Sequence, residues 1–246
     1  MKNTMLPIIT LLALGTFAQA ADPADAHWEK MFQVMHGLPK SPKDTQLELL
    51  KALIDQGADV NAAIGFDRML RVGETRADLR GTTWPLDVAV QQGQVDMVEL
   101  LLAKGAKFHG QEMAQAAFAR IPKQSLAMIT ALLKAGADVN SRDEYGSTAL
   151  SWASYRGNKD LVTLLLAQPG IKVDQTSVDG NTALMAAAEN GHAEIAEMLL
   201  MAGANVSITD KRGETATSLA QKALAKQQAI VEKQQAMISK LQSHSK

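Results

Sequence analysis

Apolar residues recur along most of the chain at spacings of three and four, in short runs that end at glycine. In the clearest example, a run of small and apolar residues ends at Asn190-Gly191-His192, and a second, more apolar run ends at Gly203. Such spacings place apolar residues on one face of a helix, and glycine marks the turns between helices. The sequence therefore predicts pairs of short antiparallel helices.

Within this pair, single residues explain where each helix begins and ends. Thr182 is expected to cap the first helix, because its hydroxyl can accept an unpaired backbone N–H. Ala183, Ala186 and Ala187 keep that helix narrow, so a neighbouring pair can approach closely. Gly203 follows the second helix, where a left-handed C-cap is needed. The apolar face of the second helix consists of Ile195, Met198, Leu199 and Leu200. One pair cannot bury this face alone, so it needs copies on both sides.

A closing glycine recurs along the chain and sets the period of the array. It is found at Gly57, Gly105, Gly136, Gly170 and Gly203. All intervals but the first lie near a common period of about 33 residues, as in a repeat array. The first interval is longer by nearly half a period, so an insertion follows the first helical pair. Its apolar residues are interleaved with arginines. It either packs back on its own repeat as an elongated hairpin or projects as a finger, and both alternatives are open.

These motifs resemble the ankyrin repeat. The resemblance is carried by Thr182-Ala183-Leu184-Met185-Ala186-Ala187, Gly191-His192, Leu199-Leu200 and Gly203-Ala204-Asn205-Val206. The segments 57–61 and 136–140, both Gly-Ala-Asp-Val-Asn, match the closing pentapeptide of the family. The resemblance implies an all-α ankyrin repeat solenoid of about five helix–turn–helix repeats with short β-hairpin loops, followed by a long C-terminal helix. The hairpin tips and first helices of such a solenoid form a concave face that binds other proteins.

Repeat boundaries and composition divide the chain into five parts. The third repeat, 109–140, is degenerate, and it is counted because its closing pentapeptide is complete. The expected parts are a signal peptide (1–20), an N-terminal capping repeat (21–61), a hairpin-loop insertion (62–77), ankyrin repeats (78–214) and a C-terminal capping and extended helix (215–246).

The N-terminal segment 1–20 predicts export. Lys2 supplies a positive charge, residues 5–17 are apolar, and Ala18-Gln19-Ala20 has the small-x-small pattern of a cleavage site. The apolar run is shorter than the ~20 residues that span a bilayer, which argues against an uncleaved anchor. We therefore expect cleavage after Ala20, a periplasmic location and no stable membrane insertion.

The net charge bears on which kind of partner the chain binds, and the cysteine content bears on disulfides. Loss of Lys2 from 25 basic residues leaves 24 against 26 acidic ones, a net charge of −2 with neutral histidines. This balance argues against nucleic acid or an anionic membrane as the main partner. The chain has no cysteine and therefore no disulfide framework, which is common in exported bacterial proteins.

The C-terminal end of the sequence predicts a long polar helix over 215–243, rich in alanine, glutamine, lysine and leucine. Its first turns are expected to cap the array. The remainder is either a frayed or self-packed extension or a short coiled coil that pairs with another copy through 224–241. Two features favour the extension. A sustained coiled-coil seam needs more than three heptads, and this apolar seam contains glutamines.

Patterns for catalysis, metal or cofactor binding are not found in the sequence. The five histidines lack metal-ligand spacing, and no nucleophile elbow or phosphate-binding glycine loop occurs. The chain is therefore expected to be no enzyme and to need no cofactor or metal.

The leading hypothesis is a non-catalytic protein-binding module of the periplasm, either an inhibitor or immunity-type partner or an accessory factor of an exported enzyme. The alternative is a structural protein that oligomerises through its C-terminal helix. Tyr145, Tyr155 and Arg156 are the strongest candidates for partner contact, because aromatic residues are scarce here and two of them accompany an arginine. The full candidate set is Phe66, Arg68, Met69, Arg71, Arg80, Arg142, Glu144, Tyr145, Tyr155, Arg156, Asp179, Glu189, Asn190, Lys211 and Arg212.

Overall fold

A computed structural model describes residues 30–31, 34, 43–62, 64–65, 82–118 and 122–244. The chain divides into two compact units, Met1–His109 and Gly110–Lys246. Among the described residues, no helix is both long enough and apolar enough to cross a bilayer. The expected signal peptide and most of the expected first helix lie outside the described residues.

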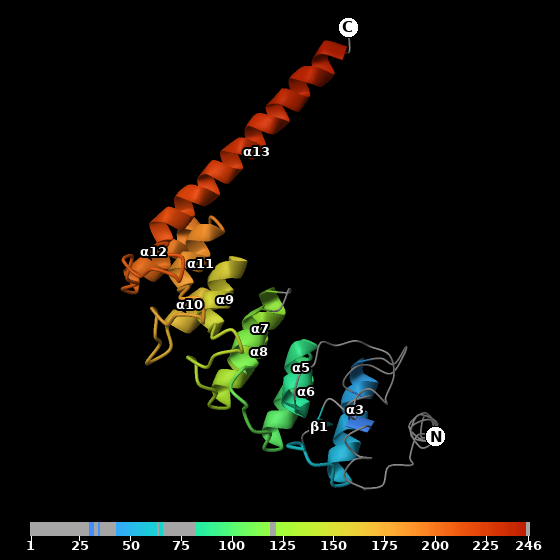
Figure 1. The fold of residues 1–246 in the computed structure, drawn as a ribbon. Helices are drawn as coiled ribbons and strands as arrows, with labels where there is room; N and C mark the ends of the chain where they lie inside the picture. Colours follow the sequence, from blue (N-terminus) through green and yellow to red (C-terminus); the bar gives the residue numbers. More distant parts are fainter. Residues whose placement is uncertain are drawn as a thin grey trace. The chain divides into compact units, whose positions relative to one another are not determined.

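The first unit contains α3 (Lys43–Asp55), β1 (Ile64–Gly65), β2 (Thr82–Thr83), α5 (Pro85–Gln91) and α6 (Val95–Ala103) (Figure 1). The two strands pair antiparallel, with Ile64 opposite Thr83. β1 lies within the expected insertion (62–77), and β2 follows it in the chain. Phe66, Arg68, Met69, Arg71 and Arg80, predicted to contact a partner, lie outside the described residues.

The second unit consists of helices in successive pairs. They are α7 (Glu112–Phe118) with α8 (Pro122–Lys134), α9 (Ala149–Arg156) with α10 (Lys159–Leu166), and α11 (Ala183–Glu189) with α12 (Ala193–Met201), followed by α13 (Ala216–His244). First helices pack on first helices, because α9 contacts both α7 and α11 and α13 begins against α11 (Figure 1). The predicted all-α repeat array with a long final helix is confirmed, with one two-residue ladder in its first unit.

The helix ends follow the predicted chemistry. The hydroxyls of Thr148 and Thr182 accept the backbone N–H groups of Ser151 and Met185. Gly203 adopts a φ of +89° just after α12, as its predicted position requires. α8 begins at Pro122, and proline suits the first helical position because it has no N–H to lose there.

The core of the second unit is a layer of aliphatic side chains from both helices of each pair. Leu150, Leu161, Leu165 and Leu199 are each at most 1% exposed. Burying a leucine removes its apolar surface from water, which stabilises the fold by about 1.5–3 kcal/mol per side chain. The predicted dependence of each repeat on its neighbours thus has a direct physical basis.

The closing pentapeptide joins successive repeats through its asparagine. In the first unit, Asn61 Nδ2 donates to Gly105 O and Asn61 Oδ1 accepts from Lys107 N, at 3.1 and 2.8 Å. In the second unit, Asn140 makes the same two contacts to Gly170 O and Lys172 N, at 2.9 and 2.8 Å. An amide side chain offers one donor and one acceptor group in fixed geometry. This explains why the pentapeptide ends in asparagine.

One ion pair also links neighbouring second helices. Lys159 Nζ on α10 lies 2.6 Å from Glu194 Oε2 on α12. The hydrogen bond between them lowers the pKa of Glu194 and raises the pKa of Lys159. Both side chains are solvent-exposed, so the pair contributes little to stability.

Candidate functional site

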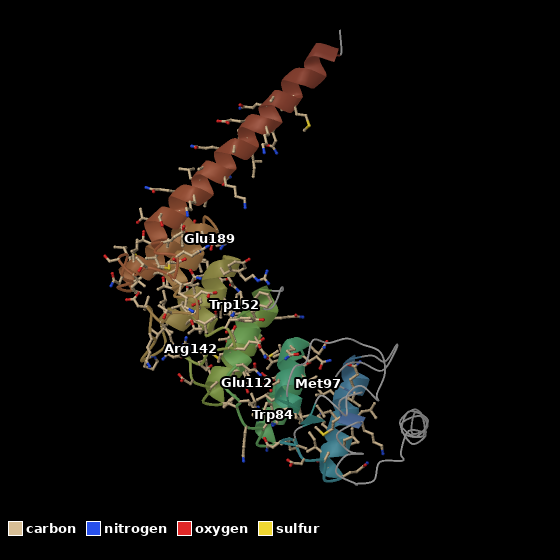
Figure 2. All side chains as sticks on the ribbon, viewed as in Figure 1. Trp84, Met97, Glu112, Arg142, Trp152 and Glu189 are labelled. Carbon is tan, nitrogen blue, oxygen red and sulfur yellow. The ribbon has the colours of Figure 1, made fainter. Side chains whose placement is uncertain are left out.

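A hollow of about 490 Å³ opens on the second unit, on the face formed by its first helices and hairpin loops. Phe118 ends α7, Trp152, Tyr155 and Arg156 lie on α9, and Glu189 ends α11. Figure 2 shows Trp152 and Glu189 on these neighbouring first helices. The lining is completed by Tyr145, Ser147, Ser151, Ser177, Asp179, Asn181, Thr182 and Ala186.

Aromatic rings form one wall of the hollow. The ring centroids of Phe118 and Trp152 are 4.5 Å apart, and those of Trp152 and Tyr155 are 5.7 Å apart in edge-to-face geometry. The Arg156 guanidinium lies over the Phe118 ring, 4.2 Å from its centroid. These contacts fix the side chains in place, while Tyr155 stays 42% exposed and Phe118 44% exposed. The wall is therefore preorganised apolar surface open to solvent.

Hydrogen bonds hold the hairpin loops that complete the hollow. Asp143 Oδ1 accepts from the backbone N–H groups of Tyr145 and Ser147, and its Oδ2 accepts from Trp152 Nε1 at 2.7 Å. The carbonyl of Tyr145 accepts from Val178 N at 2.9 Å. One carboxylate thus positions both the hairpin that carries Tyr145 and the indole on α9.

The next hairpin is fixed in the same way. Lys211 N donates to the carbonyl of Asp179 at 2.9 Å. Asp210 accepts from the backbone N–H groups of Arg212 and Glu214, each at 2.8 Å. The hairpins that begin at Asp143 and Asp210 are therefore each closed by that aspartate, and backbone hydrogen bonds join the hairpins of successive repeats.

Two carboxylates, Asp179 and Glu189, also line the hollow, and both are exposed. Asp210 raises the pKa of the Arg212 guanidinium through a hydrogen bond and charge, with smaller contributions from Glu189 and Asp179. Among the lining residues, Arg156 carries the positive charge and is placed against a ring. We call the two exposed carboxylates, Asp179 and Glu189, the acidic edge of the hollow.

Comparison with known proteins identifies the repeat. A family model for three copies of the ankyrin repeat matches residues 114–210, and a single ankyrin repeat model matches residues 84–110. The chain belongs to the ankyrin repeat family.

Curated relatives share this ankyrin region. The chain is 36% identical over 132 residues to ankyrin repeat domain-containing protein SAT10 of Stachybotrys chartarum, covering 54% of the chain and 7% of that protein. It is 39% identical over 103 residues to mouse ankyrin repeat domain-containing protein 63, covering 40% and 26%. It is 34% identical over 116 residues to rat diacylglycerol kinase zeta, covering 46% and 12%. The chain therefore spans about a quarter or less of these relatives' length.

Ankyrin repeats are protein–protein interaction modules and are generally non-catalytic. The match to diacylglycerol kinase zeta shows that such repeats also occur within an enzyme. The family therefore supports binding as the activity of the repeats themselves.

The ankyrin structure brings together five of the predicted contact residues. Tyr145, Tyr155, Arg156, Asp179 and Glu189 all line the hollow. Their role in binding remains a prediction.

The other predicted residues of the second unit lie outside the lining. The Arg142 guanidinium donates to Gly146 O and Thr176 O, at 2.8 and 2.7 Å, and so joins two hairpins. Asn190 Nδ2 donates to Ala186 O at the end of α11. The remaining three, which are exposed, are Glu144, Lys211 and Arg212.

Sequence reasoning missed Phe118 and Trp152, two of the three rings of the aromatic wall. The repeat period was the signal that points to them, because Phe118, Trp152 and Ala186 follow one another at equal intervals close to that period. All three line the same hollow. Equivalent positions of successive ankyrin repeats thus form one continuous surface.

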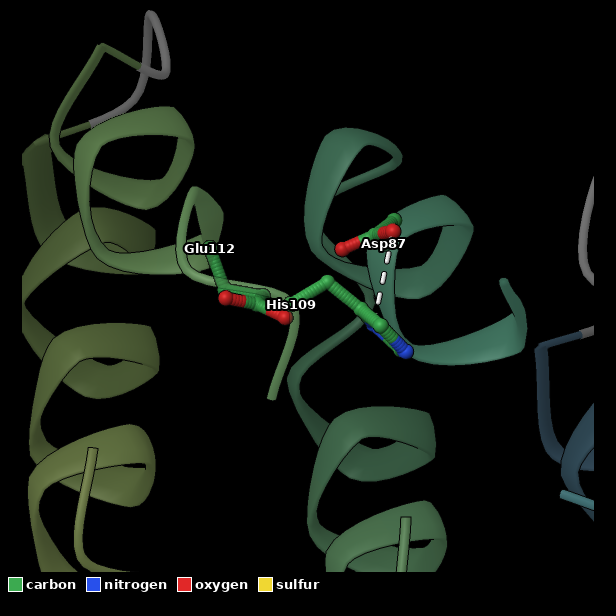
Figure 3. Close-up of side chains that lie close together, drawn as sticks. All are labelled: Asp87, His109 and Glu112. Carbon is green, nitrogen blue, oxygen red and sulfur yellow. Dashed lines mark ion pairs between the residues drawn. The ribbon is translucent and has the colours of Figure 1, made fainter. Parts of the chain in front are cut away.

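In the first unit, the ankyrin repeat 84–110 contains a buried carboxylate beside a stacked histidine. His109 stacks on Trp84 with centroids 3.8 Å apart. The Nδ1 of His109 lies 3.7 Å from Oδ2 of the fully buried Asp87 (Figure 3). In the ankyrin pattern T-P-L-H-x-A, Trp84 replaces the threonine and Asp87 replaces the histidine. His109 contacts both replacements, which indicates a structural role within this repeat.

Proposed function

We propose that this ankyrin repeat protein is a non-catalytic binding module of the periplasm that holds a partner protein in the hollow of its second unit. The observation that supports this proposal most strongly is the aromatic wall of Phe118, Trp152 and Tyr155 beside Arg156. These side chains are fixed by mutual contacts and are open to solvent. Aromatic and arginine side chains in preformed pockets dominate the binding energy of protein interfaces. The periplasmic location rests on the signal-peptide pattern of residues 1–20.

The acidic edge supports a partner that presents a basic side chain. Asp179 and Glu189 are exposed and line the same hollow as the rings, so a lysine or arginine entering the hollow can meet both carboxylates and aromatic faces. Both contacts favour a cation. An inhibitor of an exported enzyme and an accessory factor for one both fit this chemistry, and the identity of the partner decides between them.

Site-specific cross-linking tests this proposal. A photoreactive phenylalanine analogue is placed at Tyr155 or at Met201, which is 89% exposed on α12 and outside the hollow. Cells of the source organism are irradiated, and the periplasmic contents are released by osmotic shock. We expect one cross-linked protein from position 155 and none from position 201. Equal cross-linking from both positions, or products confined to the cytoplasmic fraction, would contradict the proposal.

Affinity for the cross-linked protein then measures the role of the aromatic wall. Replacing Tyr155 and Arg156 together with alanine should weaken binding at least about tenfold, because it removes two central contacts. Thermal unfolding should change little, since both side chains are exposed. Met201→Ala is the control, and its affinity should match that of the original chain. Unchanged affinity in the double variant would place the interface elsewhere.

Neutralising the acidic edge tests the charge of the partner. Asp179→Asn combined with Glu189→Gln should lower affinity several-fold and flatten its dependence on salt, because two attractive charges are lost. Glu197→Gln, at an exposed position of α12, removes a charge outside the hollow and serves as the control. Titration calorimetry at low and high salt gives both quantities. A rise in affinity would show that the partner is acidic at this contact.

A further inference from the structure

Beyond its first turn, α13 presents apolar side chains to solvent. Ala216 and Leu219 are buried at the start of the helix, which packs on α11. Farther along, Leu224 is 60% exposed, and Ile230, Val231, Met237 and Ile238 are 45–58% exposed. Figure 1 shows this part of α13 running away from the helical pairs of its unit. A folded chain gains nothing from such a stripe unless something covers it.

The sequence of α13 repeats with the heptad period. Three successive segments read A-Q-K-A-L-A-K, Q-Q-A-I-V-E-K and Q-Q-A-M-I-S-K, over 220–226, 227–233 and 234–240. Apolar residues recur in their fourth and fifth positions, glutamine in the second and lysine in the last. A straight α-helix drifts by ~20° per heptad from such a repeat, so a strict heptad period keeps its stripe aligned only when helices supercoil around each other.

The repeat creates a stripe without charge. Leu224, Val231 and Ile238 form one edge of the stripe, and Ile230 and Met237 form the other. Gln227 and Gln234 lie between the two edges, because about 3.6 residues complete one turn. Every charged residue of 220–240 falls in other columns of the repeat: Lys222, Lys226, Glu232, Lys233 and Lys240. Two copies of this stripe can therefore meet without like-charge repulsion.

The absence of charge in the stripe also indicates which kind of helix covers it. Coiled coils that select a different partner carry charges beside the seam, which pair with the partner and repel a second copy. Here the seam consists of the columns that contain Leu224 and Gln227. The column on one side of the seam holds glutamine, and the column on the other side holds apolar residues. Within the seam, Gln227 and Gln234 have amides that both donate and accept, so the same residue of an identical helix satisfies them.

We infer that α13 pairs with α13 of a second copy of this chain in a short coiled coil. The inference goes beyond the proposed function and stands on separate residues, because the hollow and the stripe share none. Pairing places two hollows in one assembly. A partner with two binding segments is then held by both at once, which raises its effective affinity without a new contact.

Two matched double variants of the chain from Ala21 test the pairing. Val231→Lys with Ile238→Lys puts two charges in the stripe, and Ala229→Lys with Ala236→Lys puts the same charges at exposed positions of other columns. Sedimentation equilibrium over a wide concentration range should give twice the single-chain mass for the original chain and the alanine-site variant. The stripe variant should remain a single chain with unchanged thermal unfolding of the repeats.

Three outcomes would overturn the inference. The original chain is a single chain at every concentration, or the stripe variant keeps twice the single-chain mass and assembles through another surface. In the third outcome, single chains co-sediment with phosphatidylglycerol vesicles and lose this binding in the stripe variant, which assigns α13 to a lipid surface. Cross-linking from position 155 is measured in the stripe variant as well, so a failure of pairing and a failure of the hollow are distinguished.

Discussion

Replacing Leu199 with alanine should lower the free energy of unfolding of the second unit by about 2–5 kcal/mol. Leu199 lies on α12 and is 0% exposed, so the substitution leaves a cavity that the packed first and second helices cannot fully close. Each repeat is stabilised by its neighbours, so a loss of packing in one helical pair also destabilises the repeats on both sides. Urea unfolding followed by far-UV circular dichroism measures the change.

Leu200→Ala is the matched control on the same helix. Leu200 is 45% exposed, so its truncation removes less buried surface and should cost under about 1 kcal/mol. The dependence of the free energy on urea should keep the same slope in both variants, because the surface exposed on unfolding is nearly unchanged. Equal losses from the two leucines would show that α12 does not pack as the structure has it.

The same two leucines show which parts of the structure can be predicted from the sequence and which cannot. Spacing and capping residues were sufficient to predict the repeats, because Thr182, Gly191 and Gly203 act within a few residues of their own positions. The sequence placed Leu199 and Leu200 together on one apolar face. Which of them is fully buried depends on how α12 rotates against its neighbours, and that is decided by contacts between repeats.

The hollow could be predicted only in part, for a related reason. Tyr145, Tyr155 and Arg156 belong to well-conforming repeats, so the family pattern placed them on the binding face. Phe118 belongs to the degenerate repeat 109–140, where no motif fixes the register. Trp152 was missed because its direction depends on the hydrogen bond from its indole to Asp143 in the preceding hairpin. Contacts of this kind arise from the folded hairpin rather than from local spacing.

Gly180→Ala should cost more stability than the same substitution at a glycine of similar φ that has open space around it. Gly180 has a φ of +84°, and a Cβ atom there would lie 3.0 Å from Asp210 Cα and 3.2 Å from Lys211 N. Asp210 cannot retreat easily, because its carboxylate closes its own hairpin through Arg212 N and Glu214 N. We expect a loss of about 2–3 kcal/mol, of which about 1 kcal/mol is the left-handed strain of alanine.

Gly191→Ala separates these two causes. Gly191 has a similar φ of +71°, but a Cβ atom there would meet nothing within 4 Å. Its loss should be limited to the strain of about 1 kcal/mol, measured by the same urea titration. An equal loss at both positions would mean that the hairpins of neighbouring repeats are not in contact.

The contact at Gly180 also connects stability with binding. Lys211 N donates to the carbonyl of Asp179, the residue next to Gly180, and the Asp179 side chain lines the hollow. A Cβ atom at position 180 pushes the two hairpins apart and therefore moves this carboxylate. Gly180→Ala should weaken partner binding at temperatures where the chain is still folded, whereas Gly191→Ala should leave binding unchanged. Undiminished affinity in folded Gly180→Ala would show that the position of Asp179 does not matter for the partner.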